Sequence, residues 1–148
     1  MRAVVQRVKS ASVTIEGEIR GKTGVGYMVL LGVEENDTEK DLDYIVEKLI
    51  GLRIFEDDEG KMNRSIVDAG GSILLISQFT LYGDARKGRR PSFIRAARPE
   101  KAVPLYEAAI ERLRASVPVE TGEFGAEMLV ELANDGPVTI LLDSERNF

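Results

Sequence analysis

The chain of 148 residues contains neither cysteine nor histidine. Without cysteine it has no disulfide framework, no thiolate nucleophile and no cysteine ligand for zinc. Without histidine it lacks the commonest general base and the commonest transition-metal ligand, which excludes Ser-His and Cys-His catalytic pairs. We therefore expect no metal and no cofactor, and any catalysis must use carboxylates, backbone groups or the substrate itself.

Long apolar runs are also lacking. No run approaches the roughly 20 residues that span a bilayer, and the charged stretch from Met1 to Lys9 has no apolar core of signal-peptide length. We expect a cytoplasmic protein without a membrane partner. The net charge of -5 argues against broad, non-specific nucleic-acid binding, although a local basic patch could still bind one nucleic-acid end.

The hydrophobic pattern predicts one α+β domain over residues 1–148, with a mainly antiparallel sheet or roll and two principal amphipathic helices. Thr38, followed by Asp41, predicts a capping box at the start of the first helix, whose apolar residues recur at helical spacing up to Leu49. The second helix is predicted over residues 100–116, with Pro104 near its first turn. Strands are predicted over residues 2–8, 11–15, 27–33, 73–76, 128–132 and 138–142, with a hairpin over 54–61, a bend over 21–26, turns over 68–71 and 134–137, and a glycine-punctuated loop over 121–126.

Three neutral polar side chains interrupt the apolar run at the end of the predicted strand 73–76. Ser77, Gln78 and Thr80 follow that strand, with Phe79 among them and loop residues directly afterwards. A buried hydroxyl or amide without a partner costs about 1–3 kcal/mol, so these groups either bond to neighbouring strands or form a site. Thr80 as a nucleophile would need an adjacent base, and no histidine can supply it. Ser77, Gln78 and the nearby backbone N–H groups fit oxyanion or positioning roles better.

A second candidate lies at Gly136 and Pro137. The preceding Asn134 and Asp135 favour a hairpin turn there. The alternative is a rigid backbone surface that meets a ligand closely, because glycine has no side chain and a bond before proline can be cis at modest cost.

One segment, residues 84–99, is strongly basic within this acidic chain. It is either a solvated loop or a loop that contacts phosphates, and the concentration of positive charge in one place favours the second interpretation. Its cations are Arg86, Lys87, Arg89, Arg90, Arg95 and Arg98.

Five blocks of the sequence together resemble the D-aminoacyl-tRNA deacylase family. They are Met1–Val8, Ser77–Tyr82, Lys87–Phe93, Thr121–Met128 and Asn134–Thr139. The likeness runs from the first residue to about Ser144, in the order and spacing of the family. One tetrapeptide such as SQFT or GPVT would be weak evidence, whereas all the blocks together are highly specific.

The resemblance implies an enzyme that hydrolyses the ester between a D-amino acid, or glycine, and the 3′-terminal adenosine of tRNA. This chiral proofreading recycles mischarged tRNA in translation quality control. The resemblance also implies a homodimer, in which Gly136 and Pro137, joined by a cis bond, enter the partner's pocket and exclude L side chains. Arg7 would orient their carbonyls, and Phe79, Phe124 and Met128 would line the pocket of the terminal adenosine.

Two mechanisms remain open for such an enzyme. In one, Thr80 forms an acyl-enzyme; in the other, which we favour, the 2′-hydroxyl of the tRNA assists attack by water while the protein positions the ester. Two rival functions also remain. The chain could be a non-catalytic module that binds RNA or DNA ends through Arg86–Arg98, or a deacylase of relaxed preference that clears glycine or L-alanine.

Overall fold

One long strand, β1 (Arg2–Ile15), organises the sheet in the computed structural model, which describes every residue from Met1 to Phe148. Alternate side chains in its first half are buried, because one face of the strand lies against the core. Its partner β8 (Leu129–Asp143) runs antiparallel to it along nearly its whole length. The two strands predicted over residues 2–8 and 11–15 are therefore one element, because this long-range pairing continues through the exposed Lys9 and Ser10.

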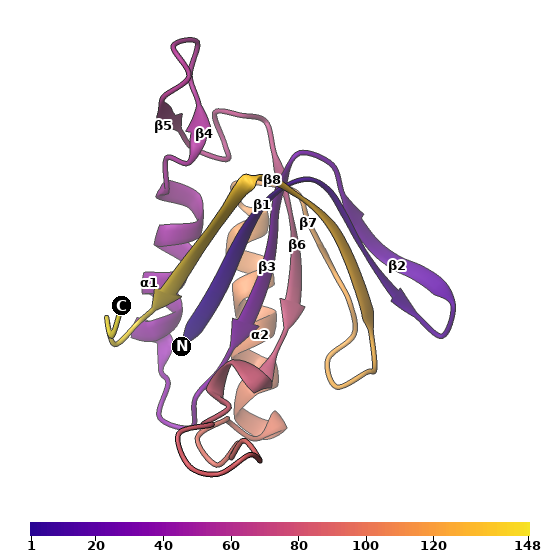
Figure 1. Ribbon diagram of the computed structural model, residues 1–148, viewed down its shortest axis with the longest axis vertical. Coiled ribbons are helices and arrows are strands. Elements are labelled where there is room, and N and C mark those ends of the chain that lie inside the picture. Colours follow the sequence, from indigo (N-terminus) through magenta and orange to yellow (C-terminus); the bar gives the residue numbers. More distant parts are fainter.

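The rest of the sheet grows from the other edge of β1. β3 (Gly26–Gly32) pairs with the first half of β1 and β2 (Glu18–Thr23) with the second half, both antiparallel. Beyond β3, the strands β6 (Ser72–Ser77) and β7 (Val119–Thr121) continue the sheet in parallel. β2 then returns close to β7, where the Lys22 amide donates to the Glu120 carboxylate over 3.1 Å. The predicted α+β class with a mainly antiparallel sheet is confirmed, and the sheet curls nearly into a barrel (Figure 1).

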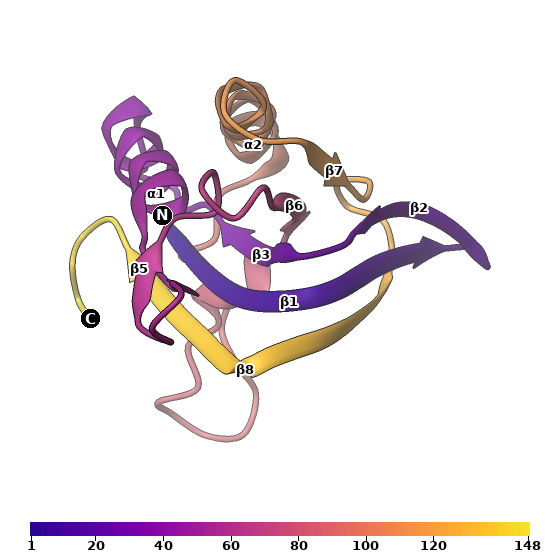
Figure 2. The same ribbon diagram turned by 90° about the horizontal axis from the view of Figure 1, so that it is seen from above.

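Two helices, α1 (Glu39–Gly51) and α2 (Pro99–Arg114), lie on one face of this sheet, as Figure 2 shows. The predicted capping box of α1 is confirmed, because the Thr38 hydroxyl accepts from the Lys40 amide and the Asp41 carboxylate accepts from the Thr38 amide. The apolar faces of both helices and the inner faces of β1, β3 and β6 form the main core of 24 buried residues.

Pro104 lies deeper in α2 than the expected position near its first turn, where a missing N–H would do little harm. The helix begins at Pro99, whose missing N–H is harmless at the first position. The Ala102 amide already donates to the Arg98 carbonyl over 2.9 Å, so Pro104 lies in the second turn and removes one intrahelical hydrogen bond. Burial of Leu105 and its neighbours offsets that loss.

Several short elements also depart from the expected pattern. The first half of the bend predicted over residues 21–26 is the end of β2, and β7 occupies the start of the predicted loop over 121–126. The predicted hairpin exists as β4 (Phe55–Glu56) and β5 (Met62–Arg64), although its second strand comes later than expected. A short 3₁₀ helix, η1 (Phe79–Tyr82), follows β6.

The turn predicted over residues 134–137 is wrong, because β8 continues through it. Val8 of β1 pairs with Asn134, and Gln6 pairs with Thr139. The four residues Asp135–Val138 therefore lie opposite the single residue Arg7 and bulge out of the ladder. β1 is long enough to pair with both halves of β8, so a hairpin at this point is not needed.

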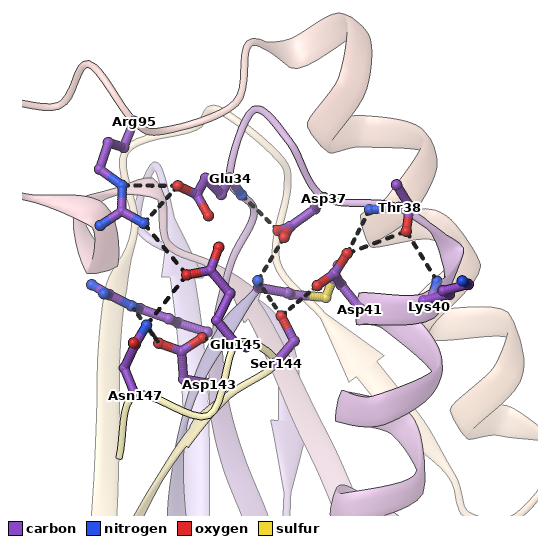
Figure 3. A network of polar contacts seen from close by, with 12 residues as sticks. Glu34, Asp37, Thr38, Lys40, Asp41, Arg95, Asp143, Ser144, Glu145 and Asn147 are labelled. Carbon is purple, nitrogen blue, oxygen red and sulfur yellow. Dashed lines mark hydrogen bonds and ion pairs between the residues drawn. The ribbon is translucent and has the colours of Figure 1, made fainter.

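A polar network joins the start of β1, the start of α1 and the end of β8 (Figure 3). The Met1 ammonium donates to the Asp37 carboxylate and to the Ser144 hydroxyl, both over 2.7 Å. The Ser144 hydroxyl donates in turn to Asp41 over 2.7 Å. These bonds fix the edge of the sheet to the helix layer. Neither helix is long and apolar enough to cross a membrane.

Candidate functional site

A cavity of about 230 Å³ lies where the end of β6 meets the loop before β8. It brings together five of the predicted site residues, which come from two segments far apart in the sequence. Its lining contains no ionisable side chain, so it is a neutral, mostly apolar recess. The lining residues are Ile76, Ser77, Gln78, Phe79, Phe124, Gly125, Ala126, Met128 and Val130. A larger, open recess of about 700 Å³ shares Ala126 and Met128 with it.

The end of β6 leaves two backbone donors beside this cavity. The Gln78 amide donates to the Leu31 carbonyl over 2.8 Å and so completes the pairing with β3. The chain then turns into η1, and the first N–H groups of a helix have no partner within it. The Gln78 side chain makes no capping bond to them. The N–H groups of Phe79 and Thr80 are therefore available to an acceptor outside the helix, such as an oxyanion.

Thr80 stands next to the cavity without a base. Its side chain is exposed, and its hydroxyl accepts a hydrogen bond from the Gln78 amide group. Because that bond uses a lone pair, the hydroxyl can still donate its own hydrogen. A neutral amide does not remove a proton from an alcohol, so this geometry favours a positioning role for Thr80.

Aromatic contacts fix both sides of the cavity. Phe79 packs edge-on against Phe93, with ring centroids 5.2 Å apart, and Phe124 packs against Tyr106 at 6.1 Å. The Tyr106 hydroxyl donates to the Leu75 carbonyl of β6 over 2.8 Å, and burial raises the pKa of Tyr106 to about 12. Tyr106 therefore joins α2 to the strand that ends in the site.

Sequence reasoning missed two supporting residues. Tyr106 falls at helical spacing with the buried Ala102 and Ala109, and that spacing could have identified it as inward-facing. Gly122 has no room for a side chain, because a Cβ atom there would collide with the Met128 sulfur. No local signal distinguishes Gly122 from the other glycine of its loop, since the restriction comes from a residue across the cavity.

Gly136 and Pro137 lie outside the cavity of their own chain, in the β8 bulge. The bond between them is cis, and Gly136 has a φ of 121°, a conformation that favours glycine. A Cβ atom on Gly136 would come within 2.7 Å of a Val138 methyl group and 3.2 Å of the Arg7 guanidinium. This close packing gives the bulge a defined shape.

Arg7 supports the bulge from beneath and is 5% exposed. Its Nη1 donates to the Ile54 carbonyl over 2.7 Å, and its Nε donates to the Asp135 carbonyl over 3.3 Å. The carbonyl that it holds is thus that of the residue before Gly136. The carboxylates of Asp135 and Glu56 lie 3.4 and 4.0 Å from its guanidinium. Arg7 therefore ties the bulge to the chain segment that enters β4.

Comparisons with known proteins agree over almost the whole chain. The model of the family described as D-Tyr-tRNA(Tyr) deacylase matches residues 4–143. D-aminoacyl-tRNA deacylases of Symbiobacterium thermophilum and Thermus aquaticus are 64% and 59% identical to the chain; the first match covers 100% of this chain and 99% of the relative, the second 97% and 95%.

Two solved structures have a closely similar fold. One described as c-Myc DNA Unwinding Element Binding Protein has a TM-score of 0.91 and 45% identity, covering 97% of this chain and 98% of its own. The structure of a probable eukaryotic D-amino acid tRNA deacylase has a TM-score of 0.81, with 96% and 98% covered. At 20% identity, that second likeness concerns the fold alone.

Proposed function

Because this chain belongs to the D-Tyr-tRNA(Tyr) deacylase family, we propose that residues 1–148, as one domain, hydrolyse the ester between a D-amino acid and the 3′-terminal adenosine of tRNA. The observation that carries the proposal is the full-length identity of 58–64% to relatives named D-aminoacyl-tRNA deacylase. The cavity supports it, since a neutral recess with aromatic walls and free backbone donors suits a nucleoside ester. Such an enzyme would remove wrong-handed amino acids, or glycine, and return the tRNA to translation in the cytoplasm.

The residues of the cavity divide into two roles under this proposal. Phe79, Phe124 and Met128 hold the terminal adenine, because bases stack favourably on aromatic and thioether side chains. Ser77, Gln78 and Thr80 position the aminoacyl ester at the end of β6.

Hydrolysis then needs no titrating side chain. Water attacks the ester carbonyl carbon, and the developing oxyanion accepts hydrogen bonds from the N–H groups of Phe79 and Thr80. The bond between the carbonyl carbon and the ribose oxygen breaks, the free amino acid leaves as a carboxylic acid, and the ribose oxygen takes up a proton. The neighbouring 2′-hydroxyl of the ribose relays the proton from the water. One well-placed oxyanion donor contributes about 2.7–4 kcal/mol to such a reaction.

The selectivity for D-amino acids is assigned to Gly136 and Pro137 of a second copy of the chain. Two features support a homodimer. These residues lie outside the cavity of their own chain, and the outer edge of β8 has no strand paired to it. An open edge is a ready surface for another chain. Exposed apolar side chains along β8 strengthen the argument: Leu129, Leu132 and Leu141.

In the dimer, the bulge would act by exclusion. The backbone of Gly136 and Pro137 faces the α-amino group of the substrate, so an L side chain collides with it and a D side chain points away. Arg7 positions the bulge through the Asp135 carbonyl. Glycine, which has no side chain, passes the filter, so we expect glycyl-tRNA to be hydrolysed too.

Deacylation of D-tyrosyl-tRNA and L-tyrosyl-tRNA, measured side by side, tests the proposal. We expect hydrolysis of the D ester and resistance of the L ester; equal rates would contradict the filter, and no hydrolysis of either would contradict the function. A Thr80→Ala variant should keep most of its activity. A covalent acyl-Thr80 adduct would show instead that Thr80 is the nucleophile.

Light scattering would establish whether the protein is a dimer.

A second candidate function is the binding of nucleic-acid ends without catalysis. One solved relative is named as a protein that binds a DNA unwinding element, and this chain has a basic segment over residues 84–99. Binding of a DNA duplex together with a lack of turnover on every aminoacyl-tRNA would favour it.

A further inference from the structure

The positive charge of this acidic protein is concentrated in one exposed loop. Residues 86–90, here called the basic loop, contain four cations around Gly88, while the whole chain has a net charge of -5. The ends of the loop are joined, since Asp84 and Ser92 exchange two backbone hydrogen bonds of 2.7 and 2.8 Å. Gly88 has a φ of 69° and turns the chain at the tip. The loop is therefore closed at its base.

Some cations of this region are paired with carboxylates, whereas others have no partner in the chain. Arg86 donates to the Asp84 carboxylate over 2.9 Å through Nε, and this hydrogen bond lowers the pKa of Asp84. Arg95 is paired with Glu34 and Glu145 (Figure 3). Three cations of the basic loop are exposed and make neither an ion pair nor a side-chain hydrogen bond: Lys87, Arg89 and Arg90. Their charges remain free for a partner.

The basic loop also forms a recess. A hollow of about 540 Å³ is lined only by polar residues: Asp84, Arg86, Lys87, Arg90 and Ser92. With three cations and one carboxylate, it carries an excess of positive charge. A second hollow of about 250 Å³ shares Asp84 and Arg86 with it and adds Arg2 and Arg95. The cations of the second hollow are all paired with carboxylates, so the basic surface available to an anionic chain is the first hollow.

This surface begins next to the cavity. Asp84 follows η1 after one residue and lies four positions after Thr80, which limits the distance between their Cα atoms to about 14 Å. Phe93, in the returning arm of the loop, packs directly on Phe79 of the cavity. A strand whose 3′ end entered the cavity would therefore place its nearest phosphates over the basic loop.

We infer that Lys87, Arg89 and Arg90 bind the phosphates of the tRNA acceptor end and so position the ester in the cavity. This inference rests on the proposed function, because it takes RNA as the partner. Contacts to phosphates position a nucleic acid without reading its sequence. The basic loop should accordingly contribute equally to the binding of tRNAs of different sequence. Selection between D- and L-amino acids should depend on other residues.

Counterion release sets the size of the expected effect. Each phosphate contact on a single strand changes the logarithm of the affinity by about 0.7 per tenfold change in salt, or about fivefold at 0.1 M. Loss of three contacts should weaken tRNA binding on the order of 100-fold at 0.1 M salt and reduce the salt slope by about 2. The loss should appear in KM for tRNA rather than in kcat.

The test compares two triple variants of equal charge. Lys87→Ala/Arg89→Ala/Arg90→Ala removes the free cations of the loop, and the control Lys40→Ala/Lys48→Ala/Lys61→Ala removes three lysine charges from α1 and the β4–β5 hairpin. Binding of uncharged tRNA is measured by fluorescence anisotropy from 50 to 400 mM KCl. Hydrolysis is measured on D-tyrosyl-tRNA and on D-tyrosyl-adenosine, which has no phosphate.

We expect the loop variant to lose tRNA affinity and to hydrolyse D-tyrosyl-adenosine at the wild-type rate, while the control changes tRNA binding less than threefold. Conservative exchange (Lys87→Arg/Arg89→Lys/Arg90→Lys) should restore most of the binding. Wild-type tRNA affinity in the loop variant would overturn the inference while leaving the proposed function intact. Tighter binding of a DNA duplex than of tRNA would overturn it in favour of DNA. A wild-type protein inactive on both esters would instead defeat the proposed function.

Discussion

Replacement of Arg7 by methionine tests how much the hydrogen bonds of this side chain contribute to stability and to the conformation of the β8 bulge. Arg7→Met keeps much of the buried side-chain volume and removes both donors. The carbonyls of Ile54 and Asp135 then lose hydrogen bonds of 2.7 and 3.3 Å. The Glu56 carboxylate matters less, because it is 57% exposed and lies 4.0 Å from the guanidinium.

The magnitude follows from these contacts. Hydrogen bonds from a charged donor contribute about 1.5–3 kcal/mol each, and the longer bond belongs at the lower end of that range. Removal of the buried charge also removes its own desolvation cost, which offsets part of the loss. We expect the free energy of unfolding to fall by about 2–3 kcal/mol, or Tm by about 4–12 °C for a chain of this size.

The same substitution should weaken chiral selection. The bond to Asp135 immediately precedes Gly136, and about 1.4 kcal/mol of lost positioning corresponds to a tenfold change in rate ratio. We expect the ratio of kcat/KM for D-tyrosyl-tRNA to that for L-tyrosyl-tRNA to fall about tenfold. Urea unfolding followed by circular dichroism, and deacylation of both esters, measure the two effects.

The matched control is Glu56→Gln, which leaves both backbone bonds of Arg7 in place. It should change stability by less than about 1 kcal/mol, because exposed ion pairs contribute little. An Arg7→Met protein as stable as the wild type would refute the energetic reasoning. A destabilised protein with an unchanged D-to-L ratio would refute the positioning role of Arg7.

Three further substitutions test the backbone and the supporting core. Phe79→Pro and Phe79→Ala both remove the ring, but only proline removes the N–H, and its fixed φ suits the first position of η1. We therefore expect kcat to be about 10²–10³ times lower for the proline variant than for the alanine variant. Equal values of kcat would exclude this N–H group as an oxyanion donor. Gly136→Ala places a Cβ atom 2.7 Å from Val138 at a φ of 121°, and should cost about 1–3 kcal/mol in thermal unfolding, whereas Gly24→Ala, with no atom within 4 Å, should be neutral. Burial raises the pKa of Tyr106 to about 12, above its unfolded value near 10. The contribution of the neutral Tyr106 hydroxyl to stability is complete below pH 10 and is lost as pH rises towards 12. Tyr106→Phe should thus be less stable than the wild type by about 1 kcal/mol at pH 8 and lose less stability between pH 10 and 12. Parallel curves of unfolding free energy against pH for the two proteins would contradict this assignment.

Elements determined by local chemistry could be predicted from the sequence. Thr38 and Asp41 lie within one turn, so their capping box depends on nothing distant. The apolar run that became β6 is buried in any pairing, and the polar residues at its end, Ser77 and Gln78, lie in the lining of the cavity. By contrast, β2 has a mostly exposed and polar sequence and exists because β1 supplies its hydrogen bonds. Such a strand has almost no signal of its own.

The failure at residues 134–137 has the same cause. Asp-Gly followed by proline favours a turn locally. In the folded chain, however, both flanking segments of β8 pair with one continuous partner, and the extra residues leave the ladder opposite Arg7. β8 continues through these residues because β1 is long enough to pair with both of its halves, and the sequence around Gly136 does not show this. No local pattern indicates that Gly136 and Pro137 lie outside the cavity of their own chain; only the family resemblance implied it.

Under the proposed mechanism, the backbone donors at the end of β6 explain how a chain without histidine stabilises an oxyanion. The Gln78 amide is used by the Leu31 carbonyl, so η1 begins one residue later and leaves the N–H groups of Phe79 and Thr80 without helical partners. Donors of this kind exist whatever side chains occupy the two positions, and they need no ionisation at any pH. Activity should therefore withstand side-chain exchanges at Thr80 better than changes that move the start of η1. Phe79→Pro, which removes one of the two donors, should therefore cost more activity than Thr80→Ala.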